Sequence, residues 1–215
     1  MKHTTECYLC GAQATTKDHI PPRGMFPQPR PTDLITVPSC EKCNNNLSLD
    51  DEYFRINVAA ISGDSPQSMT LLKQRIIPRT RKKPGLAIRL LLSVRHADVY
   101  NEGGVYTGRG PAVTLDRPRM QAVINKIVRG LFLKHTGRSL PMGHMVRDYV
   151  LSPTLSEHAQ QEVLKLPLFK VGDGSVFNYC YCVDAGTSES VWFLMFYDDR
   201  VLFVTNTGGT EDASH

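Results

Sequence analysis

The feature that most limits the fold is a pair of Cys-x-x-Cys motifs near the N-terminus, Cys7 with Cys10 and Cys40 with Cys43. Two such turns bring four sulfur atoms to one point, and thiolates are preferred ligands of tetrahedral zinc. The surrounding segment is rich in Cys, Pro, Asn and Asp and cannot bury a large core. We therefore expect a structural zinc, about one per chain, to supply the stability that apolar burial does not.

Composition and the N-terminus indicate the class of protein and its compartment. The chain has 215 residues, of which 41% are hydrophobic and 21% are charged, as in ordinary globular proteins. The first residues, MKHTTECYLC, lack the apolar run of a signal peptide, and no stretch approaches the roughly 20 apolar residues of a membrane span. We expect a cytoplasmic protein with no membrane partner, whose N-terminal cysteines bind metal rather than form disulfides.

The second half of the chain shows two regular patterns. Apolar residues recur at three- and four-residue steps over residues 116–136, which predicts a long amphipathic helix that stops at Gly137. The basic residues of this helix, Lys126 among them, are expected to add to a basic surface. Three aromatic and β-branched runs then predict a C-terminal antiparallel meander, with a tight turn at Asp198 and Asp199. The fold class is therefore α+β.

The residues between and after the cysteine pairs carry the chemistry. Asp18 and His19 lie between the pairs, and Asn44 directly follows the last cysteine. One ion that clamps both pairs could bring these three side chains together. Asp18 and Asn44 offer oxygen ligands suited to Mg²⁺ or Mn²⁺, ions that also bridge to phosphate oxygens. His19 could take a proton from a water molecule that attacks phosphorus.

These residues resemble a known family. The pattern C-x-x-C, then DHIP, then C-x-x-C-N looks like the four-cysteine branch of the HNH nucleases, the ββα-metal endonucleases, over about residues 5–57. The resemblance implies a zinc-stabilised ββα module with His19 as general base and Asp18 and Asn44 as ligands of the catalytic Mg²⁺ or Mn²⁺. It also implies a product with a 5′ phosphate and a prokaryotic or phage origin.

One position departs from the family pattern. HNH nucleases usually have an asparagine shortly before the second cysteine pair, where it braces the loop that carries the histidine. The corresponding region here is TDLITVPSC, which offers only Asp33 or Thr36. An Asp side chain can form similar hydrogen bonds within its own loop, which makes Asp33 a candidate for this bracing role. Thr36 stays open as the other candidate.

Basic residues near these motifs are candidates for contact with substrate. Residues 65–97 contain no Asp or Glu, and the tract IIPRTRKKPGLAIRLLLSV within them is predicted to be a loop between an apolar piece and a strand-like one. A basic run is most often a solvated face, but beside a nuclease module such clusters supply sequence-independent affinity for nucleic acid. The candidates are Arg23, Lys42, Arg79, Arg81, Lys82 and Lys83.

Three acidic residues, Asp50, Asp51 and Glu52, follow the second cysteine pair. We expect them to open a helix, because carboxylates are favourable at the positive N-terminal end of a helix. A minor alternative is that one of them reaches the catalytic cation.

Together the patterns predict an HNH module over residues 1–62, a basic connecting region over 63–115, an α+β domain over 116–207 and a disordered tail over 208–215. The expected function is metal-dependent endonuclease activity on nucleic acid, with DNA as the expected substrate. The alternative is a zinc-stabilised module that binds nucleic acid or protein without catalysis. A homodimer also stays open, because double-strand cleavage with one site per chain often requires two chains.

Overall fold

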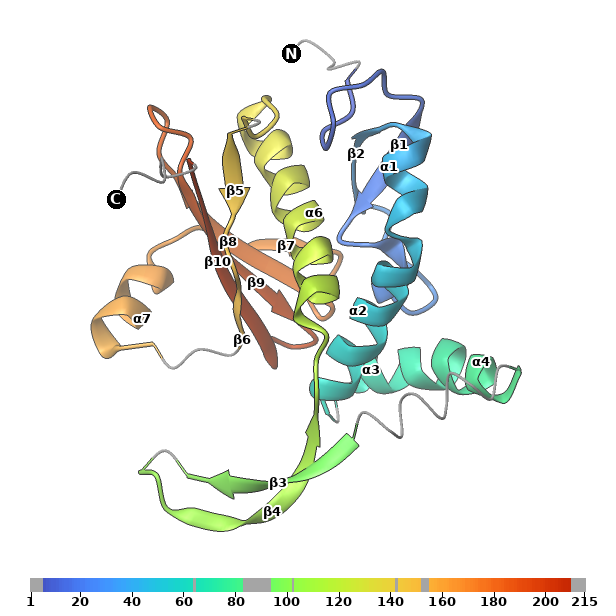
Figure 1. Cartoon of the computed structure of the whole chain (residues 1–215), viewed down its shortest axis with the longest axis vertical. Coiled ribbons are helices and arrows are strands. Elements are labelled where there is room, and N and C mark those ends of the chain that lie inside the picture. Colours follow the sequence, from blue (N-terminus) through green and yellow to red (C-terminus); the bar gives the residue numbers. More distant parts are fainter. Residues whose placement is uncertain are drawn as a thin grey trace.

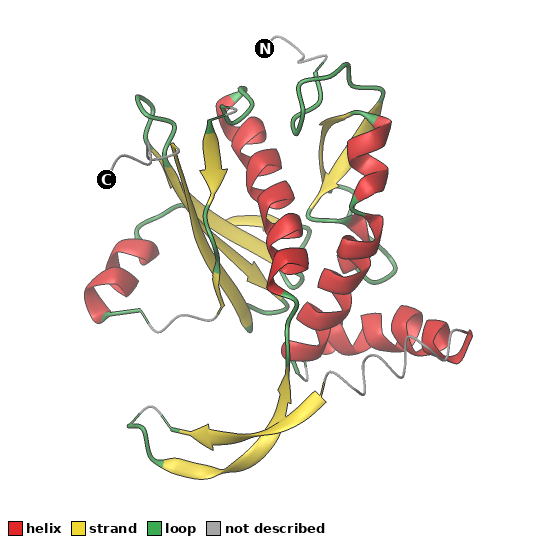
Figure 2. Ribbon diagram, in the orientation of Figure 1, coloured by secondary structure: helices red, strands yellow, loops and turns green. Residues whose placement is uncertain are grey.

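The structure is a computed structural model that describes residues 6–63, 65–82, 94–101, 103–141, 143–151 and 155–209. It combines helices with antiparallel sheets, so the α+β class is confirmed. Figures 1 and 2 show a small N-terminal hairpin with its helices on one side, a larger C-terminal sheet on the other, and one long helix between them.

The N-terminal region consists of two antiparallel strands followed by two helices, where the resemblance implied two strands and one helix. In the hairpin, Asp18 lies opposite Val37 and His19 opposite Thr36. Short strands with few buried side chains give this region only a small core of its own. The elements are β1 (Thr16–Ile20), the 3-10 turn η1 (Arg23–Met25), β2 (Ile35–Ser39), α1 (Glu41–Asn46) and α2 (Ser48–Ile61).

The basic middle of the chain begins with a helical segment made of α3 (Pro66–Leu71), the π-type turn η2 (Leu72–Ile76) and α4 (Ile77–Lys82). The predicted loop is therefore wrong over residues 76–82. Pro78 is the second residue of α4, in a first turn, where the missing N–H costs least, and the π-type turn before it rearranges the backbone hydrogen bonds. Residues 83–93 of the predicted loop lie outside the described residues.

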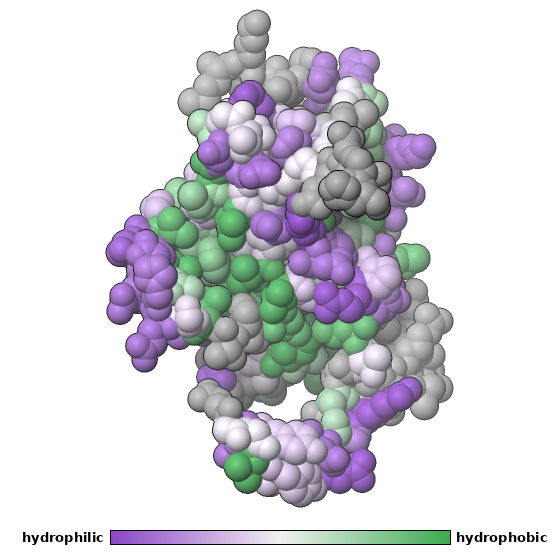
Figure 3. Space-filling model, turned by 60° about the vertical axis from the view of Figure 1, so that its left-hand side comes forward, coloured by the Kyte–Doolittle hydropathy of each residue, from purple (hydrophilic) through white to green (hydrophobic). Residues whose placement is uncertain are grey.

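A β-hairpin follows, formed by β3 (Val94–Tyr100) and β4 (Tyr106–Val113). It forms a sheet separate from the other two. The hairpin projects below the body of the molecule, and hydrophobic residues gather on the face of the body above it (Figure 3).

The long helix α6 (Arg117–Thr136) confirms the amphipathic helix that the apolar spacing predicted. The Asp116 side chain caps its first turn by accepting from the N–H of Arg119, and Gly137 ends it in the left-handed conformation (φ 69°). One prediction for this helix is wrong. Lys126 does not add to a basic surface, because its side chain is only 1% exposed.

The C-terminal sheet has the strand order β5-β10-β9-β8-β7, with β6 also paired to β10. The meander β8-β9-β10 is confirmed, and Asp198 and Asp199 lie in its tight turn with positive φ. The short flanking strands and α7 lack patterns long enough to predict. The elements are β5 (His144–Val146), β6 (Val150–Leu151), α7 (Glu157–Leu164), β7 (Phe169–Val171), β8 (Phe177–Val183), β9 (Ser190–Phe196) and β10 (Val201–Gly209).

Buried side chains join the N-terminal region to the C-terminal sheet. Phe54 of α2 packs against Phe196 and Phe203, with ring centroids 5.7 and 5.6 Å apart. The hydroxyl of Tyr197 donates to the carbonyl oxygen of Met25 at 3.0 Å. The predicted domain boundaries stay predictions, but these regions share one apolar core.

The predicted disordered tail, residues 208–215, is wrong at its first two residues. Gly208 and Gly209 belong to β10 rather than to a tail, because they pair with β5. Residues 210–215, the rest of the predicted tail, lie outside the described part of the chain. Among the described helices, even the 20-residue α6 is too polar to cross a bilayer.

Candidate active site

The four N-terminal cysteines form a cluster in which all sulfur atoms lie within 4.8 Å of one another. The sulfurs of Cys10 and Cys40 are 3.7 Å apart, close to the edge of about 3.8 Å that tetrahedral geometry gives for Zn–S bonds of about 2.3 Å. Burial raises the pKa of Cys7, but hydrogen bonds from the backbone of Cys40, Leu9 and Cys10 outweigh it and lower this pKa to about 6. Burial and hydrogen bonds with the other three thiols raise the pKa of Cys43, so without a cation the four cysteines share their protons unequally. A thiolate is the form that binds metal, so the cluster fits a structural zinc.

The cysteine cluster also positions Asn44. Cys40 is the N-cap of α1, where its sulfur accepts from the N–H of Cys43. Asn44 is the next residue of that helix after Cys43. The amide nitrogen of Asn44 donates to Thr16 Oγ1 at 3.1 Å and to the carbonyl oxygen of Lys17 at 3.4 Å. Its amide oxygen is left without a hydrogen bond to any described residue. The helix after the cluster is thereby tied to β1.

Asp18 is on the buried face of β1, only 4% exposed. One carboxylate oxygen, Oδ1, accepts from the backbone N–H of His19 at 2.8 Å. The other, Oδ2, accepts from the hydroxyl of Tyr8 at 2.9 Å and lies 3.2 Å from Lys126 Nζ. Since a carboxylate oxygen can accept two hydrogen bonds, Oδ1 retains one free position.

His19 is on the opposite face of β1, because successive side chains of a strand alternate. Its ring lines a cavity and forms no hydrogen bond to the described side chains. Burial lowers the pKa of His19, and the charge of Arg23 lowers it further, against a smaller opposing effect of Asp18. The imidazole is therefore neutral at pH 7 and able to accept a proton.

Asp51 of α2 lines the cavity, and the buried Lys126 of α6 pairs with it from behind the lining. Lys126 Nζ lies 2.8 Å from Asp51 Oδ2 and 3.2 Å from Asp18 Oδ2, so one buried ammonium pairs with two carboxylates. Burial raises the pKa of Asp51 in spite of the opposing attraction of Lys126. Asp51 Oδ1 is buried and has no hydrogen-bond partner. The sequence signal for Lys126 was its place beside the apolar stripe of α6, three residues after Val123.

Asp18, Asn44 and Asp51 line one cavity, and each has an oxygen with a free acceptor position: Asp18 Oδ1, Asn44 Oδ1 and Asp51 Oδ1. Carboxylate and amide oxygens are the ligands that Mg²⁺ and Mn²⁺ prefer. The unpartnered carboxylate oxygen of Asp51 is the clearest sign of a fit, because a buried acceptor without a partner is costly. Asp50 and Glu52 do not compete for this place, since they pair with Arg119 and with Arg55 and Arg79.

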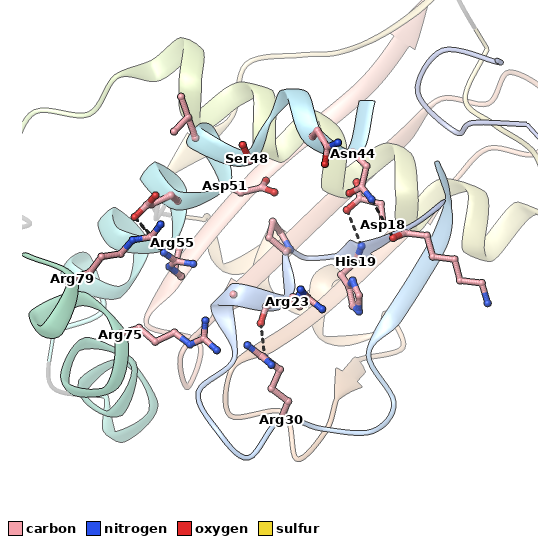
Figure 4. Close-up of a pocket in the computed structure, with 16 residues that line it drawn as sticks. Asp18, His19, Arg23, Arg30, Asn44, Ser48, Asp51, Arg55, Arg75 and Arg79 are labelled. Atoms are coloured by element: carbon pink, nitrogen blue, oxygen red, sulfur yellow. Dashed lines mark hydrogen bonds and ion pairs between the residues drawn. The ribbon is translucent and has the colours of Figure 1, made fainter. Parts of the chain in front are cut away.

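The cavity measures about 880 Å³ and is chemically asymmetric. Asp18, His19, Asn44 and Asp51 lie toward one end in Figure 4. Arginines occupy the rest, and the guanidinium groups of Arg23, Arg30 and Arg75 point toward a common space (Figure 4). The lining arginines are Arg23, Arg30, Arg55, Arg75 and Arg79.

The residues predicted to contact substrate are divided by the structure. Arg23 and Arg79 line the cavity, and Lys82 lines a neighbouring groove together with Arg75 and Arg79. Lys42 is exposed on α1 and lines neither. The side chain of Arg81 and all of Lys83 lie outside the described residues. Sequence reasoning missed two cavity arginines, Arg30 and Arg55, which carry no motif, and it included Arg75 only as a member of the basic run over residues 65–97.

Neither candidate for bracing the histidine loop forms a side-chain hydrogen bond with His19. Asp33 accepts from the backbone N–H of Gly172 with both oxygens, each at 3.0 Å, and so ties the loop after β1 to the C-terminal sheet. Thr36 is exposed and pairs with His19 only through the strand register. Asp18 takes part of the role instead, through its bond to the N–H of His19.

Searches for similar proteins found none: no protein-family profile, curated protein or solved structure matches the chain. Functional inference therefore starts from the residues of the cavity and their geometry.

Proposed function

We propose that the cavity is the active site of a metal-dependent, HNH-type endonuclease that hydrolyses phosphodiester bonds in nucleic acid, with DNA as the expected substrate. The observation that carries the proposal is the convergence of His19, Asp18 and Asn44 on one cavity beside the four-cysteine cluster. These are the residues that the resemblance to four-cysteine HNH nucleases marks as base and cation ligands. The positive charge of the cavity further supports a phosphate-containing substrate.

In the proposed mechanism, His19 accepts a proton from the attacking water molecule. Its ring is neutral at pH 7 because burial lowers its pKa, and it has no competing hydrogen bond to the described side chains. The backbone of His19 is held by Asp18, which fixes the base relative to the cation ligands. Arg23, next to the histidine in the cavity, is suited to hold the scissile phosphate.

Asp18, Asn44 and Asp51 would hold the catalytic Mg²⁺ or Mn²⁺. When bound there, the divalent cation supplies positive charge that stabilises the leaving 3′ oxygen. Lys126 is a positioning residue in this scheme. It neutralises part of the charge of Asp18 and Asp51, so that two carboxylates can stay close together before a cation binds.

The four cysteines are assigned to a structural zinc. Four thiolates leave no open coordination position, so the zinc would hold the two cysteine turns rather than take part in hydrolysis. Its effect on activity would be indirect, through the placement of Asn44 and β1.

A cleavage assay tests the proposal. Purified protein is incubated with supercoiled plasmid, duplex, branched and single-stranded DNA and RNA, with Mg²⁺, with Mn²⁺ and without either. We expect divalent-dependent cutting that His19→Ala reduces by about 10² to 10⁴-fold, the usual contribution of a general base. His96→Ala, at an exposed position of the β3-β4 hairpin, is the matched control and should cut as the wild type does.

Two results would contradict the proposal. Cleavage that persists unchanged in His19→Ala would show that another residue or a contaminant is responsible. Retardation of nucleic acid without cleavage of any substrate would favour the alternative, a zinc-stabilised binding module.

A further inference from the structure

The arginine end of the cavity, defined as Arg30, Arg55, Arg75 and Arg79, is larger than hydrolysis of one phosphodiester requires. Its residues come from the loop after η1 and from α2, η2 and α4. Figure 4 shows Arg55, Arg75 and Arg79 on the side of the cavity away from Asp18 and Asn44. Residues so distant in sequence meet here only because the helical segment α3-η2-α4 packs beside α2.

The arginine end has far more positive than negative charge. Within the described residues, Glu52 is the one carboxylate paired with it, at 3.7 Å from Arg55 and 3.2 Å from Arg79. The other two arginines form no ion pair with a described residue. Four guanidinium groups against one carboxylate leave an excess of three positive charges. Like charges held this close repel one another, so an anion would stabilise the arrangement.

The surroundings of Arg55 also favour a bound anion. The Arg55 side chain is 12% exposed, and its Nε is buried without a hydrogen-bond acceptor. Gly24 makes room for it, because a Cβ there would lie 2.5 Å from Arg55 Nη1. Burial lowers the pKa of Arg55, and the charges of Arg79 and Arg75 lower it further, against the effect of Glu52. Arg55 lines the cavity, and an anion there would offset the charge of a guanidinium group that burial has deprived of water.

The arginine end continues into a neighbouring groove. That groove is lined by Gln28, Gln74, Arg75, Pro78, Arg79 and Lys82, so it shares Arg75 and Arg79 with the cavity. A strand bound at His19 could therefore run past the arginines and onward along the groove. A closed arginine pocket would instead suit a terminal phosphate.

We infer that the arginine end binds a second, uncleaved phosphate of the substrate strand, an internal phosphodiester next to the one hydrolysed at His19. This inference rests on the proposed nuclease function and extends it to the substrate class. The planar guanidinium fork matches two oxygens of a phosphate, and such contacts position a strand without reading its sequence. The substrate is therefore a polynucleotide strand that extends beyond the cleaved bond, not an isolated phosphodiester.

A scan with neutral linkages tests the inference. Oligonucleotides that each carry one uncharged methylphosphonate linkage, at successive positions, are titrated against the full-length protein without Mg²⁺ or Mn²⁺. We expect one position away from the cleaved bond at which the neutral linkage weakens binding about tenfold, as for lost charge-assisted hydrogen bonds. In Arg55→Gln/Arg75→Gln, the unmodified strand should bind about tenfold more weakly and this position should no longer matter.

The control variant removes the same charge elsewhere. Lys134→Gln/Arg138→Gln changes two exposed residues near the end of α6 that do not line the cavity, and it should keep the full effect of the neutral linkage. If Arg55→Gln lowers the thermal midpoint, Arg75→Gln alone is used, because Arg75 forms no ion pair with a described residue.

Three results would overturn the inference: no sensitive position outside the cleaved bond, equal sensitivity in the arginine variant, or loss of binding that follows removal of a terminal phosphate alone. Failure of the proposed function is read separately, from cleavage of the same oligonucleotides with Mg²⁺. A protein that binds with the expected sensitive position but never cuts would sink the nuclease mechanism and leave the phosphate site standing.

Discussion

The N-terminal region and the C-terminal region of this protein reach a folded structure by different means. In the C-terminal region, α6 and the sheet bury a large set of aromatic and aliphatic side chains, including Trp192, Phe196 and Phe203. The N-terminal hairpin has two strands of five residues each, and we expect a zinc at the four-cysteine cluster to hold its turns together.

The candidate catalytic residues and most of the buried apolar side chains therefore lie in different regions. His19, Asp18 and Asn44 lie in the region with the small core, where a metal cluster can fix the chain tightly. The C-terminal region contributes the buried Lys126, which reaches across to Asp18 and Asp51. We therefore expect a substitution of Lys126 to affect the site, although Lys126 is far from Asp18 and Asp51 in the sequence.

The largest expected effect comes from breaking the cysteine cluster with Cys40→Ser. Structural zinc contributes on the order of 10 kcal/mol to folding in small metal-stabilised modules. We expect zinc content to fall from about one per chain to none, with loss of hydrogen-exchange protection in β1, β2 and α1. The strands β8 to β10 should stay protected, because apolar burial holds them.

Cys182→Ser is the matched control for this prediction, since Cys182 is an exposed cysteine of the C-terminal sheet. It should leave both zinc content and protection unchanged. Equal loss of protection in β8 to β10 of Cys40→Ser would mean that the two regions unfold together, and the contrast between them would fail.

A smaller effect is expected from Lys126→Met, which removes the ammonium shared by Asp18 and Asp51. Loss of one partner of a buried ion pair leaves uncompensated charge and costs about 3 kcal/mol. Chemical denaturation should therefore show a free energy of unfolding lower by about that amount. The exposed Lys134 on the same helix gives the control, Lys134→Met, which should change stability by less than about 0.5 kcal/mol.

A second substitution separates lost charge pairing from lost packing at Lys126. In Lys126→Met/Asp51→Asn one carboxylate is also removed, so part of the lost stability should return. If the double variant is less stable than Lys126→Met by the full cost of Asp51→Asn, the two residues are not coupled.

The smallest expected effect is that of Asp33→Ala, which removes the acceptor of the Gly172 N–H. We expect a loss of stability of about 1 kcal/mol, typical of one hydrogen bond, and an unchanged cleavage rate. Thermal unfolding and single-turnover cleavage measure the two quantities. A reduced rate with unchanged stability would instead support the bracing role that the sequence left open for Asp33.

Patterns of spacing were sufficient to predict the elements that depend on local repetition. The apolar stripe of residues 116–136, the stop at Gly137 and the aromatic runs of the meander all correspond to elements of the structure. Sequence patterns missed the helix α4 and the short strands β5 to β7, because the π-type turn and the edge pairings depend on contacts with distant segments.

The candidate site divides in the same way. Cysteine spacing predicted the cluster, and Asp18, His19 and Asn44 were marked by their position relative to it. Their catalytic roles stay predictions. Lys126 and the arginines Arg30, Arg55 and Arg75 were not recognised as parts of one site, because a charged residue on a helix or loop is usually solvated and only the tertiary fold buries or gathers these.

Chemical rescue of His19→Ala tests the central claim most directly. Single-turnover cleavage of a labelled duplex is measured with Mg²⁺ for the wild type and the variant, with and without added imidazole. The account predicts a rate about 10² to 10⁴-fold lower in the variant, an unchanged thermal midpoint, and a rate that imidazole partly restores. A variant that cuts at the wild-type rate without imidazole would contradict the claim that His19 is the base of a hydrolytic site.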